Sequence, residues 1–260
     1  MNKNSTFLKQ IDFTGKTAVV TGGSRGIGES IARSLASLGA EVILVSRKIE
    51  GLKAVEDKIK AEGGKAASIP CNTGNMDEIE KLFTEIKKRY DKIDVLVNNS
   101  ATNPFFGNNI DATESAWEKT FSVNLKGYFF TTQYAARIMK EKGVAGSIVN
   151  IGSVNGIKPA PLQGMYSITK AGVISMTQSW AKELAPLKIR VNAVLPGMTD
   201  TKFSSVMTQN EAILKLILPS IPMGRIAQPD EMAGAVVYLA SDASSYTTGT
   251  CLIVDGGMLA

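Results

Sequence analysis

A chain of 260 residues, of which 44% are hydrophobic and 20% charged, is long enough for one globular domain with a sizeable core. Its net charge of +5 is modest, and lysines lie beside glutamates along the expected helices, which is typical of a solvated surface and argues against a nucleic-acid partner. The chain has no histidine and only two cysteines, Cys71 and Cys251, which excludes a Ser-His-Asp or Cys-His hydrolase and the usual zinc sites, so no metal centre is expected.

Apolar, β-branched runs alternate with amphipathic stretches along the chain. In chain order, the runs predict strands at 17–21, 41–46, 66–70, 93–98, 147–151, 189–195 and 251–254. The amphipathic stretches predict helices at 27–38, 51–61, 76–90, 112–141 (from about Glu114), 165–184 and 229–240. This alternation indicates a single α/β domain over 1–260, with a parallel sheet covered by helices on both faces.

A glycine-rich turn at 21–28 joins the first strand to the first helix. Glycines at such a junction allow a pyrophosphate to approach the helix N-terminus closely. Because the turn lies in the first βαβ unit, it predicts a dinucleotide site. The expected contacts are Gly22, Ser24, Arg25, Gly26, Ile27 and Gly28.

The second strand ends in Ser46-Arg47-Lys48, where a carboxylate would pair with the ribose hydroxyls of NAD. A guanidinium beside a hydroxyl suits the 2′-phosphate of NADP instead, and Arg25 adds charge. The sequence therefore favours NADP(H), with NAD(H) possible. The alternative is that Arg47 and Lys48 are solvated charges before a helix.

The fourth strand ends in Asn98-Asn99-Ser100-Ala101, at the sheet edge where ligands bind in doubly wound folds. Small polar residues at this edge can support the backbone of a cofactor. A plain strand-ending turn is the alternative.

Tyr166 and Lys170 are four residues apart on a predicted helix, and Ser153 lies thirteen residues upstream of the tyrosine. Residues at this spacing share a helix face, so a lysine ammonium is expected to stabilise the phenolate and lower the pKa of the tyrosine. A nearby serine hydroxyl can hold a carbonyl or alcohol oxygen. The three residues predict a proton-transfer site that interconverts a ketone and an alcohol, although such a Tyr-Lys pair alone is common on helices.

The segment 196–228 after the sixth strand is irregular and rich in apolar residues. A long, partly helical insertion after a strand end predicts a lid over a binding site, at about 198–227. Extra core or an oligomer contact is the alternative.

No run approaches 18 continuous apolar residues, so no membrane span is expected. The first sixteen residues lack an apolar signal core, and two distant cysteines favour reduced thiols. A cytoplasmic protein is expected.

Taken together, these motifs resemble the short-chain dehydrogenase/reductase family over nearly the whole chain. The matching motifs are Thr-Gly-x-x-x-Gly-Ile-Gly at 21–28, Asn98-Asn99, Asn124, Ser153, Tyr166-x-x-x-Lys170, Pro196-Gly197 and Asp255-Gly256-Gly257. The stretch 103–107 also resembles the carbonyl and retinal reductases within that superfamily.

The resemblance implies a Rossmann-type fold and a catalytic tetrad of Asn124, Ser153, Tyr166 and Lys170. In that tetrad the serine orients the substrate oxygen, the tyrosine transfers the proton, the lysine lowers the tyrosine pKa and holds the nicotinamide ribose, and the asparagine fixes a water. A homotetramer or dimer packed through the helices at 112–141 and 165–185 is also implied.

Further cofactor contacts are implied at Asn72, Thr73, Asn98, Asn99, Ser100, Pro196, Gly197, Thr199 and Thr201, besides Tyr166 and Lys170. Two departures from the family pattern stand out. Ser100-Ala101 replaces the usual Ala-Gly, with little effect expected. Asn72 follows Cys71 where Asp-Val is common, and its side-chain carbonyl can accept from the adenine amino group.

The expected function is an NADP(H)-dependent oxidoreductase of the carbonyl or 3-oxoacyl reductase type, acting on a small molecule. An NAD-dependent alcohol or sugar dehydrogenase is the main alternative, and an NADP sensor without turnover is a third hypothesis.

Together with the lid, several side chains predict an apolar substrate pocket, although they could equally belong to the core: Phe105, Phe106, Leu162, Met165 and Met207. Candidate substrates are 3-oxoacyl thioesters, aromatic ketones, α-dicarbonyls, quinones and retinoid-like aldehydes. Lys158 and Lys202 are candidate contacts to an acyl-carrier phosphate.

Overall fold

The computed structural model describes residues 6–204 and 211–260, with the side chains of 211–213 outside that description. Seven parallel strands form one sheet in the order β3-β2-β1-β4-β5-β6-β7, which confirms the expected α/β fold. The strands are β1 Thr17–Thr21, β2 Glu41–Ser46, β3 Lys65–Pro70, β4 Val95–Asn98, β5 Ser147–Ile151, β6 Arg190–Pro196 and β7 Cys251–Val254. The strand order reverses between β1 and β4, and this switch creates a crevice at the carboxyl ends of the strands.

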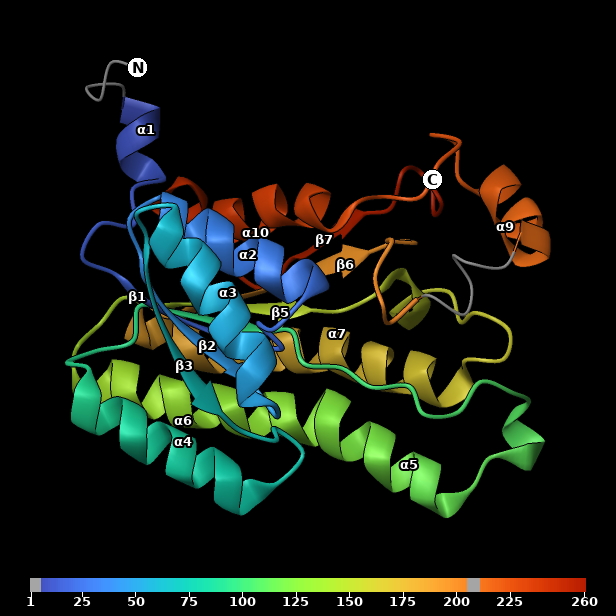
Figure 1. Cartoon of the computed structure of the whole chain (residues 1–260), viewed down its shortest axis with the longest axis horizontal. Coiled ribbons are helices and arrows are strands. Elements are labelled where there is room, and N and C mark those ends of the chain that lie inside the picture. Colours follow the sequence, from blue (N-terminus) through green and yellow to red (C-terminus); the bar gives the residue numbers. More distant parts are fainter. Residues whose placement is uncertain (1–5, 205–210) are drawn as a thin grey trace.

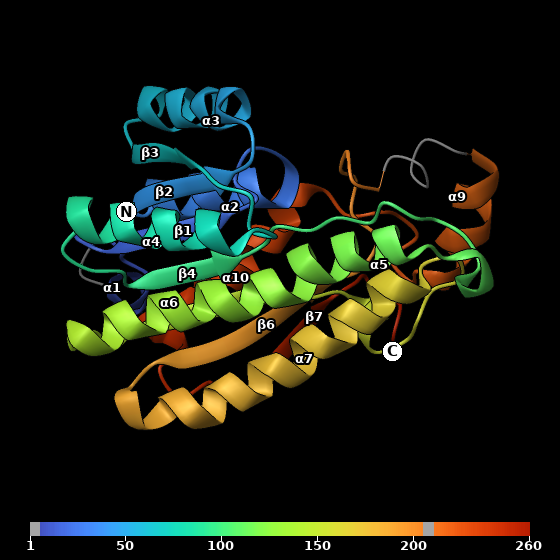
Figure 2. The ribbon, with the colours of Figure 1, turned by 90° about the horizontal axis from the view of Figure 1, so that it is seen from below.

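Helices cover both faces of the sheet (Figures 1 and 2). One face carries α2 Gly26–Ser37, α3 Ile49–Ala61 and α10 Ala233–Ala240, and the other carries α4 Met76–Arg89, α6 Gly127–Glu141 and α7 Gly164–Leu184. The remaining α-helices of the described chain are α1 Thr6–Gln10, α5 Glu114–Phe121 and α9 Glu211–Ile217. No helix in the described ranges has the length and apolar character that a bilayer crossing needs.

The central strands are buried on both faces, which explains their continuous apolar composition. Successive residues of β1 show this, because Val20 packs into the core under α2 and α10 while Val19 packs into the core under α4 and α6. The sheet is thereby fixed as a rigid platform, and the ends of its strands position the residues that follow them.

The predicted elements match the structure closely, with differences of one or two residues at several ends. The strand expected from residue 93 begins at Val95, because the Asp94 carboxylate accepts a hydrogen bond from the Thr17 backbone nitrogen at 2.8 Å. The helix expected at 229–240 opens with a 3₁₀ turn at Pro229–Met232, and α1 was not expected.

The regular helix expected over 112–141 contains an irregularity. A π-helical turn at Ser122–Lys126 separates α5 from α6, so the run is helical throughout without being one regular α-helix. Such π turns often mark functional sites, since they redirect side chains from the regular spacing. The turn contains Asn124.

Candidate active site

One large cavity of about 1110 Å³ follows the carboxyl ends of the strands, from the glycine turn to the segment after β6. It is large enough for a dinucleotide with a small substrate. Nearly all predicted site residues line it: Gly22, Ser24, Arg25, Gly26, Ile27, Gly28, Ser46, Arg47, Asn72, Thr73, Asn99, Ser100, Ser153, Tyr166, Lys170, Pro196, Gly197, Thr199 and Thr201. Asn98 and Asn124 do not line it.

The glycine turn is shaped for a close ligand. Gly22 and Gly26 have φ angles of 67° and 58°, a backbone conformation that favours glycine. A Cβ on Gly28 would lie 2.3 Å from the Gly22 carbonyl oxygen, so the turn has no room for a side chain there. In the described part of the chain no side chain caps the start of α2, whose first three residues line the cavity, so its first backbone N–H groups are left without a side-chain partner there. These groups fit a pyrophosphate.

The Asn99 side chain holds this turn against the end of β4. Its amide nitrogen donates to the carbonyl oxygens of Thr21 and Gly22 at 3.0 and 3.2 Å. The Thr21 hydroxyl in turn accepts from the Asn99 backbone nitrogen at 2.9 Å. Asn99 therefore holds the glycine turn in place, in addition to lining the cavity.

The β2 end of the cavity is cationic and open to solvent. Arg25, Arg47 and Lys48 line it with exposed side chains, and within residues 6–204 and 211–260 the Arg47 guanidinium forms no ion pair or hydrogen bond. An exposed, unpaired guanidinium can meet a phosphate without breaking an existing contact.

The Asn72 carbonyl already has a local partner. Its Oδ1 atom accepts from the Gly74 backbone nitrogen at 3.1 Å, and the Asn72 backbone nitrogen donates to Glu78 at 2.7 Å. The side chain is thus held in an Asx turn, and an adenine amino group would have to use the second lone pair of Oδ1.

Ser153, Tyr166 and Lys170 converge at the other end of the cavity and are all buried. Ser153 acts on the Tyr166 phenol through its side chain and lowers the pKa of the tyrosine. The Lys170 ammonium donates to the Ile151 carbonyl oxygen at 2.7 Å and lies 5.5 Å from the centre of the Tyr166 ring. The structure brings together two hydroxyls and one amine, carried by the β5 end and α7.

Burial is the main cause of the pKa shifts of Tyr166 and Lys170. It raises the pKa of Tyr166 to about 12, while the hydrogen bond from Ser153 acts in the opposite direction. Burial lowers the pKa of Lys170 to about 7. The expectation that the lysine lowers the tyrosine pKa is therefore wrong for this structure, because the lysine is itself desolvated and bonded to a backbone carbonyl. At neutral pH the tyrosine holds its proton.

Asn124 fastens the loop after β4 to the helices. Its Oδ1 atom accepts from the Thr102 backbone nitrogen at 2.8 Å, and its Nδ2 atom donates to the Thr102 carbonyl at 2.9 Å and to the Thr169 hydroxyl at 3.3 Å. Both amide hydrogens are engaged, so neither is free to hold a water. Asn124 positions the loop beside α7.

Asn98 lies beneath the cavity in a fully buried polar network. Its Nδ2 atom donates to Asn150 and Thr132 at 2.9 and 3.0 Å, and its Oδ1 atom accepts from Thr131 at 2.7 Å. Asn150 passes the network to Thr177 of α7 at 3.0 Å. The network joins β4, β5, α6 and α7. Neither Asn150 nor Thr177 was identified from the sequence, although a polar Asn150 within an apolar strand is a signal for a buried polar contact.

The substrate end of the cavity carries an apolar wall beside polar side chains such as Asn155 and Gln163. Phe106 and Leu162 line it, and the Phe203 ring centre lies 5.5 Å from that of Tyr166. Met165 is buried in the first turn of α7, and Phe105 packs its ring over Gly107, so neither lines the cavity. Lys202 lines it and Lys158 does not, and Met207 lies outside the described residues.

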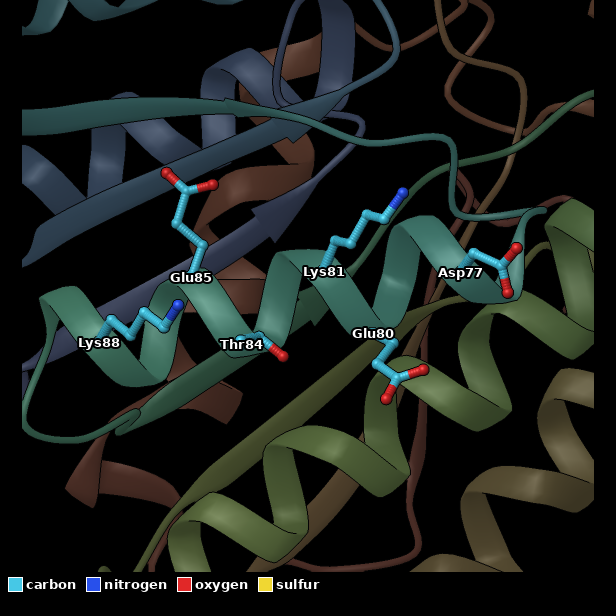
Figure 3. A pocket seen from close by; sticks show the side chains of 6 residues that line it. All are labelled: Asp77, Glu80, Lys81, Thr84, Glu85 and Lys88. Carbon is cyan, nitrogen blue, oxygen red and sulfur yellow. The ribbon is translucent and has the colours of Figure 1, made fainter.

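A second hollow of about 640 Å³ lies on the solvent side of α4, away from these residues (Figure 3). All its lining side chains come from that one helix and most are charged: Asp77, Glu80, Lys81, Thr84, Glu85 and Lys88. Their alternating charges describe a solvated helix face.

Nearly the whole chain, including the residues that line this cavity, is similar to known proteins. A family model described as enoyl-(acyl carrier protein) reductase matches residues 22–259. The chain is 37% identical over 254 residues to dehydrogenase/reductase SDR family member 4 of Mus musculus, covering 98% of this chain and 91% of that one. The chain belongs to the short-chain dehydrogenase/reductase family.

Two further relatives of this dehydrogenase/reductase differ in the substrates for which they are named. One is L-rhamnose 1-dehydrogenase (NAD(P)(+)) of Azotobacter vinelandii, 38% identical, with 94% of this chain and 96% of the relative covered. The other is the crystal structure of a gluconate 5-dehydrogenase from Burkholderia cenocepacia in complex with NADP and tartrate, with a TM-score of 0.92, 30% identity and coverage of 97% and 98%.

Membership identifies the activity at the level of reaction class. This short-chain dehydrogenase/reductase is an oxidoreductase that acts on CH–OH and C=O groups with a nicotinamide cofactor. The glycine turn, the uncapped start of α2 and the size of the cavity fit such a cofactor.

Proposed function

We propose that this enzyme reduces a ketone or aldehyde to an alcohol with NADPH, using Asn124, Ser153, Tyr166 and Lys170. The observation that carries the proposal is that Ser153, Tyr166 and Lys170, all buried, line one cavity together with Arg47 and the glycine turn. Ser153 and Tyr166 can bind one substrate oxygen with two hydroxyl groups, and the rest of the cavity accommodates the dinucleotide.

The nicotinamide supplies the hydride, and the protein orients the carbonyl and supplies the proton. Ser153 donates a hydrogen bond to the substrate oxygen and polarises the C=O bond. Tyr166 transfers its proton to that oxygen as negative charge develops. A pKa of about 12 keeps Tyr166 protonated at neutral pH, which is the form that reduction needs.

Lys170 has two roles in this proposal. One ammonium hydrogen is fixed by the Ile151 carbonyl, which leaves the others to bind the ribose hydroxyls next to the nicotinamide. Its pKa of about 7 allows it to lose and regain a proton near neutral pH, so it is suited to reprotonating Tyr166. Asn124 supports both residues through Thr169 of α7.

NADP preference rests on the β2 end of the cavity. The exposed guanidinium of Arg47, which has no partner among the described residues, suits a 2′-phosphate together with Ser46 and Arg25, which line the same cavity. An NAD-dependent alcohol or sugar dehydrogenase is the alternative, and two similar proteins are named as an L-rhamnose 1-dehydrogenase (NAD(P)(+)) and a putative gluconate dehydrogenase.

Two further parts of the proposal concern assembly and access. Exposed aromatic and aliphatic side chains on α5, α6 and α7, namely Trp117, Phe129 and Ile168, support a homotetramer or dimer packed through these helices. Leu216 and Ile217 of α9 line the cavity although Leu216 is 80% exposed, which supports a lid at about 198–227. Sedimentation velocity tests the assembly.

Parallel fluorescence titrations with NADPH and NADH, followed by a carbonyl panel on the preferred cofactor, test the proposal. Tighter NADPH binding with turnover is the expected result. Tighter NADH binding would reject the role of Arg47 and favour oxidation of an alcohol. Binding without turnover on any carbonyl would favour a nucleotide sensor.

A further inference from the structure

Leu162 has an unusual backbone conformation at the substrate end of the cavity. Its φ angle is 62°, and Lys188 is the one other non-glycine residue with a positive φ in the described ranges. Leu162 is the third residue of a turn closed by a hydrogen bond from the Gln163 nitrogen to the Ala160 carbonyl at 3.3 Å, with Pro161 second. This is the pattern of a type II turn, whose third position favours glycine or asparagine.

Neighbouring backbone holds the turn in place. The Gly107 nitrogen donates to the Leu162 carbonyl at 3.0 Å, and Gly107 forms an isolated β-bridge with Gln163. Asn109 packs so closely on Gly164 that a Cβ there would lie 2.0 Å from the Asn109 side-chain oxygen. These contacts maintain a strained leucine at the start of α7, the helix that carries Tyr166.

The Leu162 side chain contributes to the apolar wall of the cavity. It is 40% exposed and lines the cavity together with Phe106 and Phe203, whose ring lies against that of Tyr166. Four of the charged lining residues, Arg25, Arg47, Lys48 and Glu50, lie at the β2 end, and within the described residues Lys170 and Lys202 are the ones at the substrate end.

We propose that Leu162 is a specificity-determining residue that favours carbonyl substrates bearing a bulky apolar group over polyhydroxylated ones. This inference rests on the proposed carbonyl reductase function. An apolar group gains free energy by leaving water against this wall, whereas a sugar hydroxyl placed against Leu162, Phe106 or Phe203 loses its water partner and gains no hydrogen bond from these side chains. The wall contacts a part of the substrate that does not react, so it acts on binding and leaves the proton transfer unchanged.

Leu162→Gly tests the proposal because glycine accepts the turn conformation and removes the side chain. Leu162→Asn is a second variant that also tolerates a positive φ and keeps a side chain. Lys188→Gly is the matched control, since its φ is 61° and it lies past the opposite end of α7 from Tyr166. Steady-state kinetics use acetophenone, butanone and fructose with the preferred cofactor, and thermal melts check folding.

The wild-type enzyme is expected to use acetophenone in preference to fructose. Both Leu162 variants should raise KM for acetophenone about tenfold with kcat and KM for butanone little changed, because one lost aliphatic contact commonly changes discrimination by this factor. Lys188→Gly should change neither constant. An unchanged ratio of the acetophenone and butanone KM values in both Leu162 variants would overturn the proposal. So would an equal loss of kcat on both ketones, which would mean that the turn positions Tyr166.

A wild-type enzyme that prefers fructose would overturn the substrate class assigned to Leu162 but keep the carbonyl chemistry. A wild-type enzyme inactive on all three carbonyls with either cofactor would instead overturn the proposed function itself.

Discussion

The two ends of the active-site cavity achieve their chemistry in opposite ways. At the β2 end, Arg25 and Arg47 are exposed, and Arg47 has no partner in the described chain. At the α7 end, Tyr166 and Lys170 are buried, and burial shifts their pKa values in opposite directions. The β2 end presents charged side chains to solvent, whereas the α7 end holds ionisable side chains away from solvent.

This difference separates cofactor choice from catalysis. Substituting an exposed arginine changes the local potential and leaves the packing intact, so cofactor preference is adjustable at little cost in stability. Substituting Lys170 or a group beneath it changes the burial that sets the pKa of the proton donor. Substitutions at the catalytic end are therefore expected to change both activity and stability, whereas substitutions at the β2 end are expected to change mainly cofactor preference.

The largest expected effect is the loss of turnover in Tyr166→Phe. Removing the hydroxyl removes the proton donor, which should lower kcat by a factor on the order of 1000 while cofactor binding is kept. Stopped-flow turnover and a fluorescence titration measure the two quantities. Tyr134→Phe is the control, because Tyr134 stacks on Phe83 away from the cavity. Full activity in Tyr166→Phe would contradict the assignment.

Lys170 should make stability depend on pH. Its folded pKa of about 7 lies below the unfolded value of 10.5, so between these values the unfolded chain binds one more proton and wild-type stability rises with pH. Lys170→Met removes this titrating group. The free energy of unfolding of the variant minus that of the wild type should therefore be greatest below pH 7 and should fall by at most about 1.4 kcal/mol per pH unit above it.

Urea unfolding of both proteins from pH 6 to 9.5 measures this difference, below the range in which Tyr166 titrates. A pH-independent difference would show that the lysine is not desolvated in the folded enzyme.

Arg47→Asp should weaken NADPH binding by roughly 10- to 100-fold and leave NADH binding nearly unchanged, because a charge-assisted phosphate contact is lost. Arg137→Asp, the same change of charge on the exposed face of α6, is the control. The ratio of the two dissociation constants is measured by titration. A ratio that does not change would remove the argument for a 2′-phosphate site.

The smallest expected effect is that of Asn72→Ala on cofactor binding, less than about threefold, since its Oδ1 atom already accepts from Gly74 and a neutral hydrogen bond contributes little net free energy. Isothermal titration measures the change. A loss comparable to that of Arg47→Asp would mean that the adenine contact outweighs the Asx turn.

Sequence patterns predicted the sheet and the convergence of Ser153, Tyr166 and Lys170, because strand ends and helix spacing fix where these residues lie. They did not predict the pKa directions, which depend on how completely tertiary packing removes water from Tyr166 and Lys170. Asn98 lines a buried network and not the cavity, since its neighbours Thr131 and Asn150 come from distant segments.

The central claim is hydride transfer to a carbonyl carbon, and an enone tests it most directly because it offers both C=O and C=C groups. The enzyme is supplied with NADPH deuterated at either face of the nicotinamide C4, and the product is analysed by NMR. Deuterium from one of the two labelled cofactors at the carbinol carbon is the expected result. Deuterium at the β-carbon, with the carbonyl retained, would contradict the account.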